Sequence, residues 1–228
     1  MTRPRLLLAL SLLLLSTTAF AQDWRGLLGS TVDDLESQRY ARARRTSIKL
    51  INSMMDNLNS GRNAAYTMGL TVAYRAVAEA GLGNYDEADW YRHVALSMTP
   101  QVAGLDYARF GNAGNWIAAK EPEPMASASE APERVVNRQD PVCTYKRKPK
   151  YPLGAVLGRV AEPVTVRVLI DTDGSVRHPT IVTPSLAPTL IYAVTEAVKQ
   201  WQFQPATIDG KASAMEFDLT VDFQTGRN

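Results

Sequence analysis

The chain has 228 residues, of which 45% are hydrophobic and 21% charged, and this composition predicts one or two globular domains with their own cores. It excludes collagen, a coiled-coil rod and a wholly disordered chain, while the single cysteine excludes a disulfide scaffold and a multi-cysteine zinc site. The net charge is +2, and without the two arginines of residues 1–21 the remainder has 23 basic and 23 acidic residues, so charge gives no support for nucleic-acid binding.

Residues 1–21 have the pattern of a secretory signal peptide. Two arginines precede an apolar run, and Ala19-Phe20-Ala21 forms an A-x-A cleavage site, so we expect cleavage between Ala21 and Gln22. The alternative is an uncleaved membrane anchor formed by residues 6–21. We favour cleavage because these 16 residues are fewer than the roughly 20 that a membrane-spanning helix needs.

Residues 22–120 are predicted to form an all-helical domain. Apolar residues recur at helical spacing over 31–61, 64–81 and 85–98, and Ser30 or Thr31 can cap the first of these helices. The first helix is basic. We interpret its cations as a solvated face rather than a phosphate or anionic-lipid site, because the acids of the same domain nearly balance them.

The second and third of these helices resemble a tetratricopeptide repeat. Gly83-Asn84-Tyr85 occupies the turn, Ala88 and Ala95 are small residues at positions of close helix approach, and Pro100 closes the unit. The pattern occurs once, whereas a repeat array needs about three units to be stable. Two interpretations therefore stay open, a protein-binding groove and a simple αα-hairpin.

A low-hydrophobicity segment follows the helices. Residues 121–133 contain three prolines and four glutamates, which stiffen the chain and repel one another. We assign residues 121–145 to a linker and residues 146–228 to a C-terminal domain.

Strand patterns dominate the C-terminal domain. Residues 164–170 alternate with period two, Asp173-Gly174 is a strong hairpin signal, and residues 175–182 return as a second strand that contains Pro179. A helix is expected over 188–201 and a final strand over 215–223. These elements predict an α+β domain in which a three-stranded antiparallel sheet packs on one helix.

This combination of motifs is similar to the C-terminal domain of the TonB family over residues 148–224. The motifs that carry the resemblance are Tyr151-Pro152, the strand 164–170, Asp173-Gly174, Leu190, Ala193, Glu196-Ala197-Val198, Trp201-Gln-Phe203, Pro205, Asp209-Gly210-Lys211 and the final strand. The family implies a periplasmic protein whose last strand accepts an extended peptide of an outer-membrane receptor by strand addition. The partner-binding residues would be Tyr151, Pro152, Glu216, Asp218, Thr220 and Asp222.

The free sheet edge is expected at residues 215–223. The other outer strand contains Pro179, which lacks an N–H and is a poor template, whereas the final strand has no proline. Its acids, Glu216, Asp218 and Asp222, would discourage self-association. Trp201 and Phe203 are expected in the core, and His93 is expected to be exposed.

No catalytic, cofactor-binding or metal-binding residue is predicted, because the sequence contains no nucleophile elbow, phosphate loop or metal-ligand motif. We also expect no small-molecule substrate and no nucleic-acid partner. The basic segment Lys146-Arg-Lys-Pro-Lys150 is interpreted as a solvated loop, the alternative being attraction to acidic groups of a receptor, peptidoglycan or a membrane. The alternatives to receptor binding are a non-catalytic periplasmic scaffold that uses its helical domain, and a membrane-anchored energy transducer.

The signal peptide provides the first testable prediction. We expect N-terminal sequencing of the exported protein to begin at Gln22, because the A-x-A site follows a short apolar run. Recovery of an intact Met1 from the membrane fraction would contradict cleavage and favour the energy transducer.

Overall fold

The structure is a computed structural model that describes residues 24–57, 62–120, 137–153, 155, 163–183 and 187–223. The predicted cleavage site at Ala21 and Gln22, and the acidic part of the linker over 121–136, lie outside these ranges. Among the described helices, none combines the length and the hydropathy that crossing a membrane would require.

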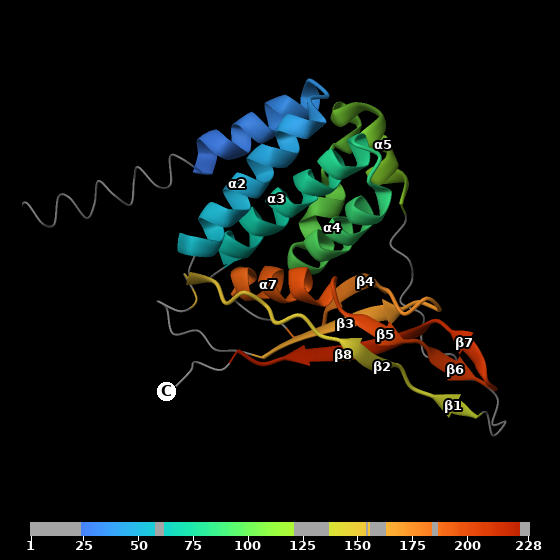
Figure 1. Cartoon of the computed structure of the whole chain (residues 1–228). Coiled ribbons are helices and arrows are strands. Elements are labelled where there is room, and N and C mark those ends of the chain that lie inside the picture. The colour runs from blue at the N-terminus through green and yellow to red at the C-terminus, as the bar shows by residue number, and fades with distance from the viewer. Residues whose placement is uncertain are drawn as a thin grey trace, which may run out of the picture.

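The helical domain is a layer of helices arranged around α3 (Figure 1). A helix over 24–36 is followed by four α-helices and two short 3-10 helices, and α3 packs against α2, α4 and α5. Their bounds are α2 Tyr40–Asn57, α3 Arg62–Gly81, α4 Tyr85–Met98, η1 Pro100–Gly104, η2 Tyr107–Phe110 and α5 Gly111–Ala119.

The predicted first helix is two helices, and the expectation of one continuous helix was wrong. The chain turns at Gln38, whose φ is 55°, while Arg39 N–H donates to Asp34 O at 2.7 Å and Gln38 N–H donates to Leu35 O at 2.9 Å. These are the two hydrogen bonds of a Schellman C-cap. The motif normally has glycine at the left-handed position, and glutamine there left no signal in the sequence. The turn after α3 has the same two bonds around Gly83, where the glycine was visible.

The C-terminal domain has the predicted α+β class. Its main sheet contains β3 (Val164–Ile170), β4 (Val176–Ile181) and β8 (Met215–Val221) in the antiparallel order β4-β3-β8, and α7 (Pro188–Val198) covers one face. The remaining strands form two separate small sheets: β2 (Val142–Tyr145) pairs with β5 (Gln202–Gln204), and β6 (Ala206–Ile208) pairs with β1 (Arg138–Gln139) and β7 (Lys211–Ser213). The first two strands in the chain, β1 and β2, thus lie in residues that we had assigned to the linker.

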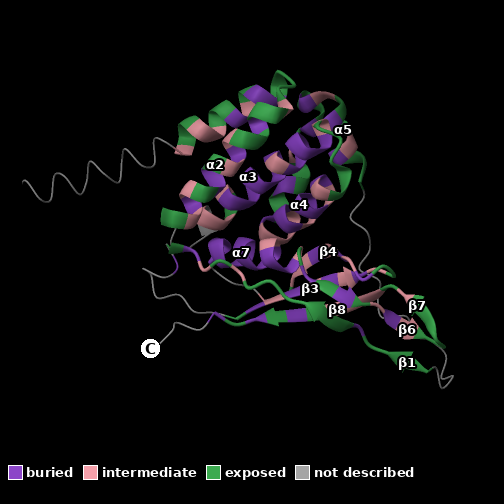
Figure 2. Cartoon of the chain, viewed as in Figure 1, coloured by how far each residue is buried: buried purple, intermediate pink, exposed green. Residues whose placement is uncertain are grey.

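The core of this domain lies between β3 and α7. Val164, Val166, Val168 and Ile170 are all at most 1% exposed, and Leu190, Val194 and Val198 of α7 are fully buried. Figure 2 shows the buried residues of α7 continuing into the helical domain above it. The period-two pattern of β3 therefore predicted its buried face correctly.

Trp201 and Phe203 close the end of this core. Their ring centroids lie 6.5 Å apart, and Trp201 Nε1–H donates to the carbonyl of Arg147 at 2.8 Å. Gly174, with φ +81°, packs directly on the backbone of Phe203, and Phe203 N–H donates to Gly174 O at 3.0 Å. The hairpin turn and the strand after α7 are thus held together where a side chain would not fit.

Replacing Trp201 by alanine should therefore destabilise the protein strongly. The indole is 4% exposed, so Trp201→Ala is expected to lower the free energy of unfolding by about 3–5 kcal/mol through the cavity and the lost hydrogen bond. Urea unfolding of the whole chain measures this, with Trp116→Ala, a half-buried indole of the helical domain, as the matched control. Equal losses in the two variants would contradict the core assignment.

Candidate partner-binding site

The β8 strand is an edge of the main sheet. It pairs with β3 over seven residues, from Val164 opposite Val221 to Ile170 opposite Met215, and no other described strand pairs with it. Figure 1 shows β8 on the side of the sheet away from the helical domain. The expected edge position of the last strand is thus confirmed.

Side chains of β8 alternate between the core and the open face of the sheet. Leu219 and Val221 are buried, while Asp218, Thr220 and Asp222 are exposed and Glu216 is half-buried. The open face of β8 is therefore polar and acidic, as its sequence predicted.

Asp218 differs from the expectation of a free edge charge. Arg167 of β3 lies directly opposite, and its Nε and Nη2 donate to the two carboxylate oxygens at 2.7 and 3.0 Å. These hydrogen bonds hold the pKa of Asp218 below its usual range. Next along the strand, the hydroxyls of Thr165 and Thr220 lie 2.9 Å apart. Cross-strand pairing therefore uses two of the predicted partner-binding side chains to stabilise the β3–β8 ladder.

Tyr151 and Pro152 lie where β8 ends. The ring of Tyr151 is 5.1 Å from the ring of Phe223, centroid to centroid, and Pro152 is buried. The structure thus brings the tyrosine–proline segment to the last strand, although the two are about seventy residues apart in the sequence.

The basic segment, residues 146–150, runs past the end of α7. Lys146 Nζ lies 4.6 Å from the centre of the Trp201 indole, and Arg147 hydrogen-bonds Gln200. Arg147, Lys148 and Lys150 line a cavity of about 760 Å³ between this segment, α2 and α7. The predicted solvated loop is therefore also the wall of a groove between the domains.

The opposite edge of the sheet is interrupted. In β4 the register shifts between the partners of Arg167 and Leu169, so that His178 and Pro179 form a bulge, and His178 has a φ of 48°. The helix α4 packs on β4. Pro179 thus disturbs the ladder as predicted, and the helical domain covers this strand.

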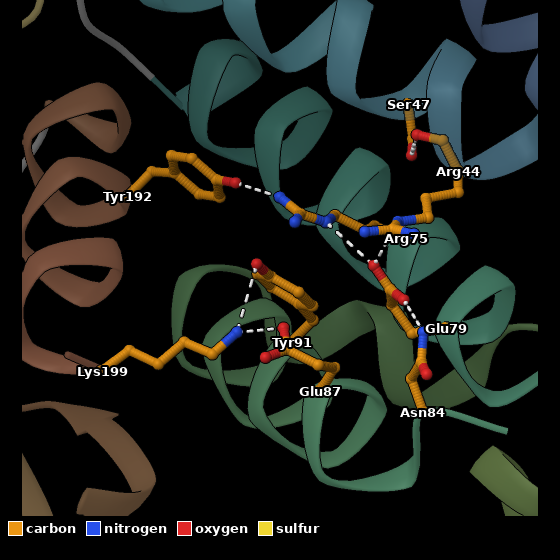
Figure 3. Close-up of polar contacts among 9 residues, drawn as sticks. All are labelled: Arg44, Ser47, Arg75, Glu79, Asn84, Glu87, Tyr91, Tyr192 and Lys199. Carbon is orange, nitrogen blue, oxygen red and sulfur yellow. Dashed lines mark hydrogen bonds and ion pairs between the residues drawn. The ribbon is translucent and has the colours of Figure 1, made fainter. Parts of the chain in front are cut away.

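A polar network joins the two domains around Arg75 of α3 (Figure 3). Its guanidinium lies 3.9 Å from the centre of the Tyr91 ring, and its Nη1 donates to the hydroxyl of Tyr192 on α7 at 2.5 Å. Burial raises the pKa of both phenols, so they stay neutral hydroxyls. A cation on one domain is thus held by two aromatic side chains, one from each domain.

The carboxylate of Glu79 balances the charges of two arginines inside the helical domain. Its side chain is 1% exposed, its carboxylate lies 3.0 Å from Arg44 and 3.7 Å from Arg75, and Asn84 Nδ2 donates to it at 2.9 Å. Figure 3 shows all three partners around the carboxylate. A buried carboxylate is tolerated because it is paired and hydrogen-bonded.

Lys199 makes the second polar contact between the domains. Just beyond α7, its ammonium pairs with Glu87 of α4 and lies 3.5 Å from the Tyr91 hydroxyl. Together with the Arg75 contact, it ties both α3 and α4 to the C-terminal domain. The αα-hairpin therefore uses this face within the chain itself, and its relation to a tetratricopeptide repeat stays a prediction.

The expectation that His93 is exposed was wrong. Its side chain is 14% exposed and its ring stacks on that of His178, 4.8 Å between centroids. Helical periodicity could not show this burial, because the covering residues belong to the other domain. The sequence did contain a signal that the two domains are in contact. On α7, the large residues Ile191 and Tyr192 lie outside the apolar stripe that faces the sheet, and both are buried.

A small α+β domain whose main sheet has an uninterrupted edge, with no other described strand paired to it, is an architecture that can accept an extended strand. Residues 147–225 match the family described as Gram-negative bacterial TonB protein C-terminal, a range that includes β3, α7 and β8. The C-terminal domain is therefore a TonB-type domain, associated with TonB-dependent transport and with a family that contacts outer-membrane receptors. No curated protein matches the chain.

The hydrogen bond between Arg75 and Tyr192 should contribute measurably to the stability of the contact between the domains. Tyr192→Phe removes the hydroxyl that accepts from a buried guanidinium, and we expect the free energy of unfolding to fall by about 1.5–3 kcal/mol. Chemical denaturation measures the loss. Tyr66→Phe is the control, because Tyr66 is 46% exposed, and a comparable loss there would contradict the assigned role of Tyr192.

Proposed function

We propose that this protein binds an extended segment of an outer-membrane receptor, or of another envelope protein, by strand addition to β8. It acts in TonB-dependent transport as a non-catalytic binding protein of the periplasm. The bound segment lies antiparallel or parallel to β8 and takes its affinity from backbone hydrogen bonds.

The unpaired edge of β8 carries this proposal. An added strand needs a row of backbone N–H and C=O groups without proline or a bulge. β8 supplies such a row over Met215–Val221, whereas β4 is interrupted at His178-Pro179 and lies under α4. The match of this domain to the TonB family supports the same strand independently.

Side chains around β8 predict the selectivity. Asp218 is already paired with Arg167, so Glu216 and Asp222 are the acids of this face that can meet a partner strand. Opposite charges across a strand pair are stabilising, so basic residues at the facing positions of the partner would be favoured. Tyr151 and Phe223 offer an aromatic contact at one end of the strand.

The helical domain has a supporting role in this proposal. It covers α7 and β4 and leaves β8 as the open edge of the main sheet among the described residues. The scaffold alternative requires partners to bind the helical domain, and the face of α3 and α4 toward the C-terminal domain is occupied by Tyr192 and Lys199. A scaffold would therefore have to use the other faces of the helices.

The test is an NMR titration of the whole chain with a synthetic peptide copied from the N-terminal periplasmic segment of an outer-membrane receptor. We expect amide shifts at residues 215–223 and around Tyr151. Thr220→Pro should weaken binding by about tenfold, because it removes a backbone N–H from the strand and disturbs the edge geometry. Shifts confined to residues 62–98 would contradict the proposal and favour the scaffold.

Thr220→Val is the matched control. It removes the same hydroxyl, which lies 2.9 Å from that of Thr165, but keeps the backbone N–H. Equal weakening by valine and proline would mean that the side chain, rather than the strand edge, binds the peptide. The β3 amides of each variant report whether the β3–β8 ladder has kept its pairing.

A further inference from the structure

The two histidines of the chain meet at the contact between the domains. His93 lies on α4 and His178 on β4, and their rings stack with 4.8 Å between centroids and 17° between planes. Both imidazoles face one carboxylate: Asp89 Oδ2 is 3.4 Å from His93 Nδ1 and 3.4 Å from His178 Nε2. The side chains are 14%, 29% and 19% exposed, in the order His93, His178 and Asp89, so solvent screens them only in part.

The backbone at His178 is unusual and places this ring. Arg177 lies opposite Leu169 and Thr180 opposite Arg167, so the bulge of β4 consists of His178 and Pro179. His178 has a φ of 48°, a conformation that costs free energy for a residue with a side chain. A bulge redirects a side chain, and here the redirected ring meets α4. Strain of this kind persists only where surrounding contacts hold it.

We propose that His93, His178 and Asp89 form an acid-sensitive latch, which docks α4 on β4 when the imidazoles are neutral and releases it when both are protonated. The latch is independent of strand addition at β8. Release would separate the helical domain from β4 and from the adjoining end of α7.

The charges around the pair explain why a second proton is not tolerated. On α4, Arg92 Nε is already 3.5 Å from Asp89, while Asp86 and Glu87 face Arg177 and Lys199. On β4, Arg177 pairs with Asp171 at 2.9 Å and lies 3.6 Å from Asp86. Asp89 would therefore have to balance two stacked imidazolium rings and Arg92 at once, and like charges at this separation repel strongly in a partly buried site.

The direction of the pH dependence follows from the docked state. Burial lowers the pKa of His93 and outweighs the opposing hydrogen bond and charge of Asp89. Burial alone would raise the pKa of Asp89, but the hydrogen bond to His178, the charge of Arg92 and, once it is protonated, the charge of His93 outweigh it and hold this pKa at about 2. Asp89 thus stays ionised through the range in which histidine titrates.

Release returns a histidine to its ordinary pKa of about 6.5, so the released state binds more protons as the pH falls below that value. Docking is fully favourable above pH 6.5 and weakens below it. For each histidine that stays neutral when docked, the equilibrium constant for opening should rise by up to about tenfold per pH unit.

The test measures hydrogen exchange of the α4 and β4 amides in the whole chain between pH 7.5 and 5.0, corrected for intrinsic exchange rates. We expect protection of these amides to fall at least tenfold across this range, while the β3 and β8 amides keep theirs. His93→Gln and His178→Gln together should abolish the pH dependence, because glutamine cannot take up the proton. Asp140→Asn, an exposed carboxylate far from the latch in the sequence, should behave as wild type.

Two results would overturn the proposal: protection that does not change with pH in the wild type, or the same pH dependence in the double variant. If the double variant fails to fold, the imidazole proton resonances of the wild type decide. Two independent titrations near pH 6.5, with no loss of amide protection at α4, would also overturn the latch.

Discussion

Almost all of the helix α7 is buried, and the rest of the architecture follows from this constraint. Ten of its eleven residues are buried: the inner side packs on β3, and the outer side packs on α3 and α4. A helix that is buried on opposite sides must lie between two layers. A small sheet covers only one side of α7, so the C-terminal domain requires the helical domain for the other side (Figure 2).

The polar contacts between the domains follow from the same burial. Tyr192 has its hydroxyl inside the interface, where an unpaired polar group would be costly, and Arg75 supplies the donor. Arg75 is in turn balanced by Glu79, whose buried carboxylate also takes Arg44 and Asn84. One apolar helix therefore determines where several charges of the helical domain must lie.

Covering α7 also distinguishes the two edges of the sheet. The helix α4 that flanks α7 extends over β4, and the bulge at His178-Pro179 fits against it. The β8 edge lies beyond the reach of these helices and keeps a regular seven-residue pairing with β3. Among the described residues, the chain thus covers one edge of the main sheet and leaves the other unpaired, which is the arrangement that strand addition requires.

The sequence by itself determined the local elements and the family of the C-terminal domain. The alternation of residues 164–170, the Asp173-Gly174 turn and the apolar stripe of α7 are short-range patterns, and each predicted its element and its buried face. Residues 147–225, which match the TonB family, contain these motifs. The break at Gln38 is also local, but its C-cap has no glycine and left no signal in the sequence. Two features were decided only by the tertiary structure. Asp218 forms an ion pair with a residue of another strand, and His93 is partly buried by a strand about eighty-five residues away. Period and propensity describe one element at a time, whereas these two features exist only when two elements lie side by side.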